Sequence, residues 1–112
     1  MTAPREPTLP PHWFQILLAL ADSERHGLGI MQDVLDRTGG RMRLWPGMLY
    51  RNLRRLEDEG LIGDSRRPGP VEPGSPRYFH ITPAGRRLCA AEARRLEAFV
   101  EAARAKKLLG RT

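Results

Sequence analysis

Residues 46–60, PGMLYRNLRRLEDEG, constrain the fold of this chain more than any other segment. Proline is tolerated in the first turn of a helix and glycine commonly follows the last turn, so the segment predicts one helix that Gly60 ends. Leu49, Leu53 and Leu56 are spaced by four and three residues, which places them on a single apolar face. A helix of this kind packs on other elements with one side and leaves the opposite side for water or a partner.

The outward side of this predicted helix carries its charges in two blocks. Arg51, Arg54 and Arg55 come first, and the acids of residues 57–59 follow. This order opposes the helix dipole, which favours acids at the N-terminus and bases at the C-terminus. One interpretation is a solvated face on which Arg54 and Arg55 pair with acids four residues later. The other is a face that meets a polyanion, and the net charge of +6 favours it.

Two more helices are expected before this one. Residues 13–21, WFQILLALA, are apolar all around the helix, which predicts burial on several sides, partly against a second subunit. Residues 27–40 have apolar side chains at helical spacing and end in Gly39-Gly40. In residues 41–45 apolar and basic side chains alternate, a pattern compatible with a very short strand.

A hairpin and a long helix are expected after it. Residues 61–65 and 77–82 are predicted strands, and the loop of residues 66–76 between them contains four prolines. Thr82-Pro83 is a typical helix start, and the helix is predicted to run to about Leu109. An apolar seam follows this helix at alternating spacings of four and three, at Cys89, Ala93, Leu96, Val100 and Ala103, widened by Leu88 and Phe99. The seam is expected to face a second copy of the chain.

Three helices, a hairpin and a long helix, in that order, predict a mainly α chain of the α+β class. The fold is a winged helix-turn-helix followed by a C-terminal dimerisation helix. We expect a flexible arm at residues 1–9, a DNA-binding domain at residues 10–82 and the dimerisation helix at residues 83–112. In this fold the third helix is the recognition helix, whose N-terminal residues enter the major groove of DNA.

Other classes of protein find little support. One cysteine cannot form an internal disulfide, and no apolar run approaches the length of a membrane span, so we expect a cytoplasmic protein without a membrane partner. There is no Gly-rich phosphate loop and no nucleophile beside a base, so neither an enzyme nor a cofactor is expected. The spacing of His12, His26 and His80 predicts no metal site, and His26 is expected to be a turn or cap residue. Cys89 is expected to be a small buried residue, with an intersubunit redox switch as the alternative.

Three segments of the chain resemble the PadR family of bacterial transcriptional regulators. HGLGI (26–30) is similar to the family's turn into helix two, PGMLYRNLRRLEDEGLI (46–62) to its recognition helix, and RYFHITPAGRRL (77–88) to its wing strand and next helix. The resemblance implies a homodimeric, ligand-responsive repressor of inverted-repeat operators. Trp45 and Met48 depart from the pattern, because small hydroxyl residues are usual there, and this removes an expected N-cap and polar DNA contacts.

The resemblance and the charge pattern together give the candidate site residues. The predicted DNA contacts are Met48, Tyr50, Arg51, Arg54, Arg55, Arg67 and Arg77. Among them Tyr50 is implied by the resemblance to be a backbone contact, and Arg67 and Arg77 are expected to reach phosphates from the wing. The predicted dimer contacts are Trp13, Leu17, Cys89, Ala93, Leu96, Phe99, Val100 and Ala103.

The expected partners are double-stranded DNA, a second copy of the chain and a small hydrophobic or aromatic effector. The family's effectors range from phenolic acids to bulky drugs, and the space between Trp13 and Leu96 or Phe99 is the expected place for one. Trp13 and Trp45 are otherwise expected in a core or an interface. The alternative function is a winged-helix protein-interaction module without specific DNA binding, and a metal-responsive sensor is a weaker rival.

Overall fold

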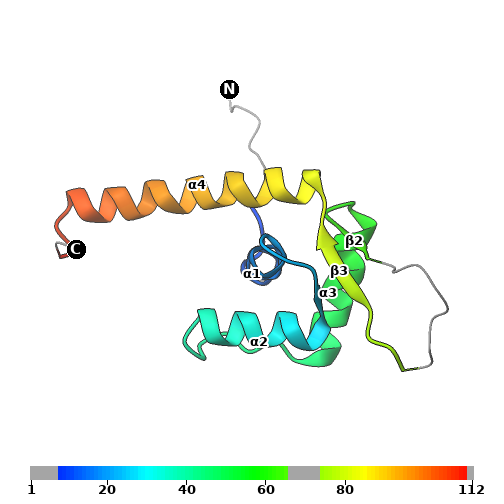
Figure 1. Cartoon of the computed structure of the whole chain (residues 1–112). Helices are drawn as coiled ribbons and strands as arrows, with labels where there is room; N and C mark the ends of the chain where they lie inside the picture. The colour runs from blue at the N-terminus through cyan, green and yellow to red at the C-terminus, as the bar shows by residue number, and fades with distance from the viewer. Residues whose placement is uncertain (1–7, 66–73, 111–112) are drawn as a thin grey trace.

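The computed structural model describes residues 8–65 and 74–110, and Figure 1 shows how their helices and strands are arranged. The elements are α1 (Pro11–Leu20), β1 (Arg25–His26), α2 (Gly27–Arg37), α3 (Pro46–Asp58), β2 (Ile62–Asp64), β3 (Tyr78–Ile81) and α4 (Pro83–Ala105). The predicted order of three helices, a hairpin and a long helix is therefore confirmed, and the chain has the winged helix-turn-helix fold.

The small sheet has one strand more than the hairpin. It is antiparallel in the order β1-β3-β2, with Arg25 opposite Phe79 and Ile62 opposite Ile81. The extra strand is Arg25–His26, whereas residues 41–45, where the alternating pattern was compatible with a strand, are irregular backbone. The pattern in residues 41–45 misleads because a strand also needs a pairing partner, and residues 41–45 pair with none of the three strands.

A single apolar core joins α1, α2, α3, the sheet and the start of α4. Its fully buried large side chains are Ile16, Leu17, Ile30, Val34, Leu44, Leu49, Leu53, Leu56 and Phe79. All three leucines predicted for the inner face of α3 are among them, so the periodicity located this helix correctly. Leu9, which the prediction assigned to the arm, is also buried in this core, and residues 1–7 of the arm lie outside the described residues.

Helices α3 and α4 end in the same way, although only the end of α3 was predicted at the right residue. At the end of α3, Gly60 has a φ of 73°, in the left-handed region that favours glycine. At the end of α4, Lys107 has a φ of 63°, and the N–H of Leu108 donates to the carbonyl of Ala103 over 2.9 Å. The predicted end near Leu109 is therefore too late, because a lysine occupies the position where the sequence rule looks for glycine.

The start of α4 is fixed tightly to the hairpin. The hydroxyl of Thr82 accepts a hydrogen bond from the N–H of Gly85 (3.1 Å), which confirms the predicted N-cap. A Cβ atom at Gly85 would lie only 2.0 Å from the carbonyl oxygen of Leu61. Glycine is thus needed here because the backbones of α4 and the hairpin approach each other so closely.

The C-terminal half of α4 extends away from the rest of the chain (Figure 1). Its buried positions end at Glu92, and nearly every side chain beyond it is exposed. Leu96, Phe99 and Val100 are 36%, 58% and 43% exposed. One chain therefore leaves most of the predicted apolar seam uncovered.

Candidate nucleic-acid interface

The outward side of α3 carries three arginines, Arg51, Arg54 and Arg55, and all are exposed. In residues 8–65 and 74–110 no acidic side chain forms an ion pair with any of them. The ion pairs to acids four residues later, which the first interpretation of this face expected, are therefore not formed in the described chain. The orientation from base to acid along a helix is the less favourable one for such pairs.

Tyr50 lies beside these arginines and crosses to the start of α2. It is 51% exposed, and a Cβ atom at Gly27 would lie 2.4 Å from its hydroxyl oxygen. Any side chain at Gly27 would displace the phenol, so the first glycine of the HGLGI segment is needed to leave room for Tyr50. Arg54 follows Tyr50 by four residues, so the two side chains lie on the same side of α3.

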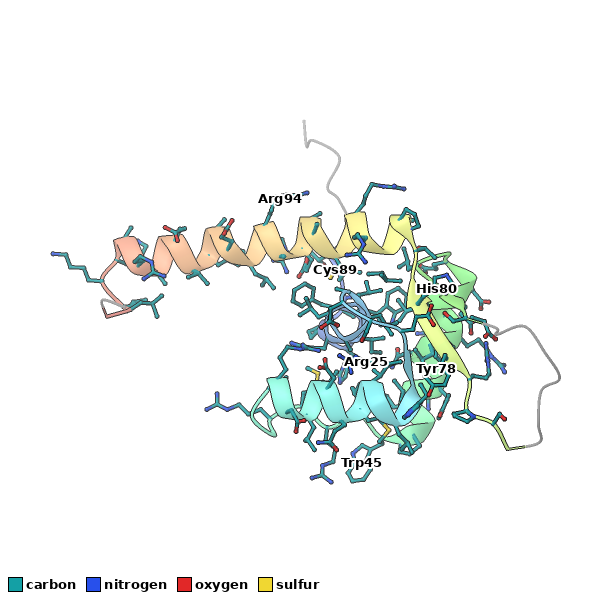
Figure 2. The ribbon with its side chains drawn as sticks, viewed as in Figure 1. Arg25, Trp45, Tyr78, His80, Cys89 and Arg94 are labelled. Atoms are coloured by element: carbon teal, nitrogen blue, oxygen red, sulfur yellow. The ribbon has the colours of Figure 1, made fainter. Side chains whose placement is uncertain are left out.

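The N-terminus of α3 has no side-chain cap. Trp45 occupies the N-cap position without a capping hydrogen bond, and it is 62% exposed. Figure 2 shows it projecting from the end of the molecule opposite α4, and the guanidinium of Arg43 lies 5.6 Å from its ring centroid. Trp45 is thus not a core residue of this chain. Met48, the predicted DNA contact in the first turn, is partly buried and packs on the core.

The opposite side of α3 is held by a hydrogen bond from α1. The indole Nε1 of Trp13 donates to Oδ1 of Asn52 over 3.0 Å, and the amide of Asn52 donates to the carbonyl of Met48 over 2.9 Å. Asn52 was not among the predicted site residues. Its only sequence signal is a polar residue beside the buried Leu49 and Leu53, and that signal does not identify its partner.

Arg77, which was predicted to contact phosphate from the wing, is surrounded by acids of the protein itself. Its guanidinium lies 2.9 Å from the carboxylate of Asp64 and 3.1 Å from that of Glu57, and it sits over the ring of Phe79 at 4.9 Å. Partial burial alone would lower the pKa of Arg77, but the hydrogen bond that it donates to Asp64 and the charges of Glu57 and Asp64 outweigh it and raise the pKa. Arg67, the other predicted wing contact, lies outside the described residues.

Apart from Trp13, described above, the predicted dimer contacts fall into three groups. Ala93 is exposed on α4 together with Leu96, Phe99 and Val100, and Ala103 is half-buried. Cys89 is buried on the side of α4 that faces α1 (Figure 2), and burial raises the pKa of its thiol. Leu17 is fully buried within one chain, so this predicted contact has no surface left for a second copy and is corrected to a core residue.

His26 caps α2, as predicted. Its Nδ1 accepts a hydrogen bond from the N–H of Gly29 over 3.0 Å, and its ring lies edge-on to that of Tyr78 with the centroids 5.3 Å apart. The described residues contain no group of three or more His, Cys, Asp and Glu side chains that could hold a metal ion. Nor is any helix among them long and apolar enough to span a membrane.

The three-helix order, the small sheet and the arginines of α3 define a class, the winged helix-turn-helix proteins that regulate transcription. Residues 16–91 match the Transcriptional regulator PadR-like family, and the chain therefore belongs to this family. The family and its relatives are regulators of transcription and not enzymes.

One curated relative supports this assignment, and two solved structures share the fold. The chain is 40% identical over 82 residues to Transcriptional regulator Rv3488 of Mycobacterium tuberculosis, a match that covers 73% of this chain and 72% of that protein. Its fold is similar to that of a transcriptional regulator from Clostridium thermocellum, with a TM-score of 0.67, 22% identity, and coverage of 83% and 86% of the two chains. It is also similar to Bacillus subtilis PadR, solved in complex with operator DNA, with a TM-score of 0.64, 19% identity, and coverage of 76% and 47%.

Proposed function

We propose that this chain is a cytoplasmic transcriptional repressor that binds an inverted-repeat operator in duplex DNA as a homodimer. The observation that carries the proposal is the row of exposed arginines on α3, Arg51, Arg54 and Arg55, none of which pairs with an acid in the described chain. Elsewhere in the same chain Arg37 and Arg77 do pair with acids. The positive face of α3 is therefore available to a polyanion.

In the proposed complex the N-terminal half of α3 enters the major groove. A guanidinium can donate two parallel hydrogen bonds to O6 and N7 of guanine or to a phosphate, and Arg51, Arg54 and Arg55 are assigned these contacts. The hydroxyl of Tyr50 is assigned to the DNA backbone. Phosphate contacts supply most of the affinity, so binding weakens steeply as salt rises.

The second copy is proposed to bind along α4. Leu96, Phe99 and Val100 form an exposed apolar strip that a symmetric partner would cover, together with Ala93. A dimer of this kind presents two copies of α3, and their centres must lie about 34 Å apart to enter successive major grooves on one side of the duplex.

An effector is proposed to act through α1. A small hydrophobic or aromatic molecule between Trp13 and the strip of Leu96 and Phe99 would contact both the dimer helix and the residue that holds α3. Because Trp13 is hydrogen-bonded to Asn52, a shift of the indole would change the position of α3, the proposed recognition helix. Such a ligand acts only if it binds one dimer geometry better than the other.

Selection of duplex sites from a random pool, combined with sedimentation, tests the proposal. The expected result is an inverted repeat with half-sites about one helical turn apart, bound by a dimer. The alternative, a protein-interaction module, predicts weak binding without a consensus that is lost at moderate salt. A chain that remains a monomer at micromolar concentration would remove the basis for the inverted repeat.

A further inference from the structure

Arg77 stands at the junction of the wing and the recognition helix. It directly precedes β3, and it pairs with Asp64 of β2 on one side and with Glu57 of α3 on the other. We propose that Arg77 is a positioning residue that sets the angle between the wing and α3 through Glu57, and that it does not contact phosphate.

The geometry favours this role because the three side chains come from α3, from β2 and from the residue just before β3. The Nε atom of Arg77 donates to Asp64 over 3.0 Å, while one terminal nitrogen donates to both carboxylate oxygens of Glu57 over 3.3 and 3.1 Å. The planar guanidinium also lies over Phe79, whose side chain is fully buried. A guanidinium held on three sides has a defined orientation, so it can transmit the position of α3 to the hairpin.

A phosphate contact is a poor alternative for Arg77. A phosphate that approached the guanidinium would also meet the negative fields of Glu57 and Asp64, which already accept hydrogen bonds from Arg77. The exposed arginines of α3 have no such neighbours in the described chain. The arginines of α3 are thus available to DNA, whereas Arg77 already pairs with two acids of the protein.

This role also gives a reason for part of the acidic block at the end of α3. Of its three acids, Glu57 is half-buried and paired with Arg77, whereas Asp58 and Glu59 are exposed and form no ion pair within the described ranges. Glu57 therefore offsets its unfavourable place near the helix C-terminus by binding the wing. Asp58 supplies a matched control, because it is the adjacent acid without that contact.

The inference rests on the proposed DNA binding. The direction in which Glu57→Ala changes the affinity for DNA distinguishes it from a simple charge effect. Glu57→Ala removes a negative charge from a DNA-binding surface, so electrostatics alone predicts tighter binding to the selected duplex. The positioning role predicts weaker binding, by about three- to tenfold, the effect expected within one interacting network. Asp58→Ala should bind the duplex as well as the wild type or better.

Arg77→Ala gives an independent result through its salt dependence. It should weaken binding about as much as Glu57→Ala, and the double variant should be little weaker than either single variant. The slope of log affinity against log salt concentration should stay at the wild-type value, whereas a lost phosphate contact would reduce it by about 0.9. A reduced slope together with tighter binding by Glu57→Ala would overturn the proposal.

Hydrogen exchange decides the positioning role without DNA. Backbone amides that pair β2 with β3 should exchange several-fold faster in Glu57→Ala and Arg77→Ala than in the wild type or Asp58→Ala. Unchanged exchange in both variants would overturn the positioning role. If the wild type shows no sequence-specific duplex binding, the proposed function fails, and this exchange result still decides the role of Arg77.

Discussion

The indole N–H of Trp13 donates a hydrogen bond to the side-chain oxygen of Asn52, 3.0 Å away, and so joins α1 to α3. α1 also packs against α4, the helix with the exposed apolar strip. A single polar contact thus links the part of the chain assigned to the dimer with the part assigned to DNA.

Trp13→Phe should lower the free energy of unfolding by about 1–3 kcal/mol, because it leaves the partly buried oxygen of Asn52 without its donor. Chemical denaturation measures this change. Trp45→Phe is the control, since Trp45 is largely exposed and should change stability by less than about 0.5 kcal/mol. Equal changes in the two variants would show that the hydrogen bond contributes nothing specific.

Trp45→Ser should stabilise the protein, by about 1 kcal/mol. The N-cap position of α3 has no side-chain hydrogen bond, and a serine hydroxyl there can accept one from the first turn. Little apolar burial is lost, because the indole is 62% exposed. The measurement is again denaturation, and a loss of stability would mean that the ring packs more favourably than its exposure indicates.

Gly85→Ala should destabilise the fold by at least about 1–3 kcal/mol, since the added methyl group would overlap the carbonyl oxygen of Leu61. Gly47→Ala is the matched control. Gly47 also lies in the first turn of a helix, but no atom comes within 4 Å of a Cβ built there. Alanine at position 47 should therefore be neutral or stabilising by up to about 1 kcal/mol. Similar losses in both variants would contradict the close approach.

The contacts of Glu92 predict that the free energy of unfolding falls at acid pH. Its carboxylate is buried on α4 and accepts two hydrogen bonds from Arg95, at 3.0 and 2.5 Å. The hydrogen bond from Arg95, followed by its charge, holds the pKa of Glu92 below the ordinary value of 4.5. A carboxyl group whose folded pKa is lowered stabilises the fold above its unfolded pKa, and this contribution is lost as pH falls through the folded value.

Glu92→Gln should therefore be less stable than the wild type at neutral pH, and the difference should shrink below about pH 4.5. Unfolding curves collected between neutral and acid pH measure it. Glu97→Gln, an exposed acid on the same helix with no ion pair in the described chain, serves as the control. A difference between Glu92→Gln and the wild type that is constant with pH would refute the assignment.

Features that depend on residues close together in the sequence were predictable. The buried face of α3 at Leu49, Leu53 and Leu56 and the Thr82 cap follow from spacing and local chemistry. The short strand Arg25–His26 did not follow, because it exists only through pairing with β3, far away in the chain. The same holds for the site: the sequence placed Arg77 beside the wing loop, but it did not reveal the partners Asp64 and Glu57, which come from β2 and α3.

A direct test of the exposed arginines of α3 needs a control arginine elsewhere that forms no ion pair in the described chain. Arg95 is unsuitable, because it pairs with the buried Glu92 and lies over the ring of Phe99. Arg94 is exposed, and Figure 2 shows it on the side of α4 opposite Cys89, away from the core. Its replacement by alanine removes the same charge as a change on α3 without breaking an ion pair of the described chain.

The central measurement is the affinity of the wild type, Arg54→Ala and Arg94→Ala for the selected inverted-repeat duplex at one fixed salt concentration. Arg54→Ala is expected to lose about 1–3 kcal/mol of binding free energy per contact, while Arg94→Ala binds like the wild type. Equal losses in the two variants, or none in either, would contradict the claim that the exposed arginines of α3 bind DNA.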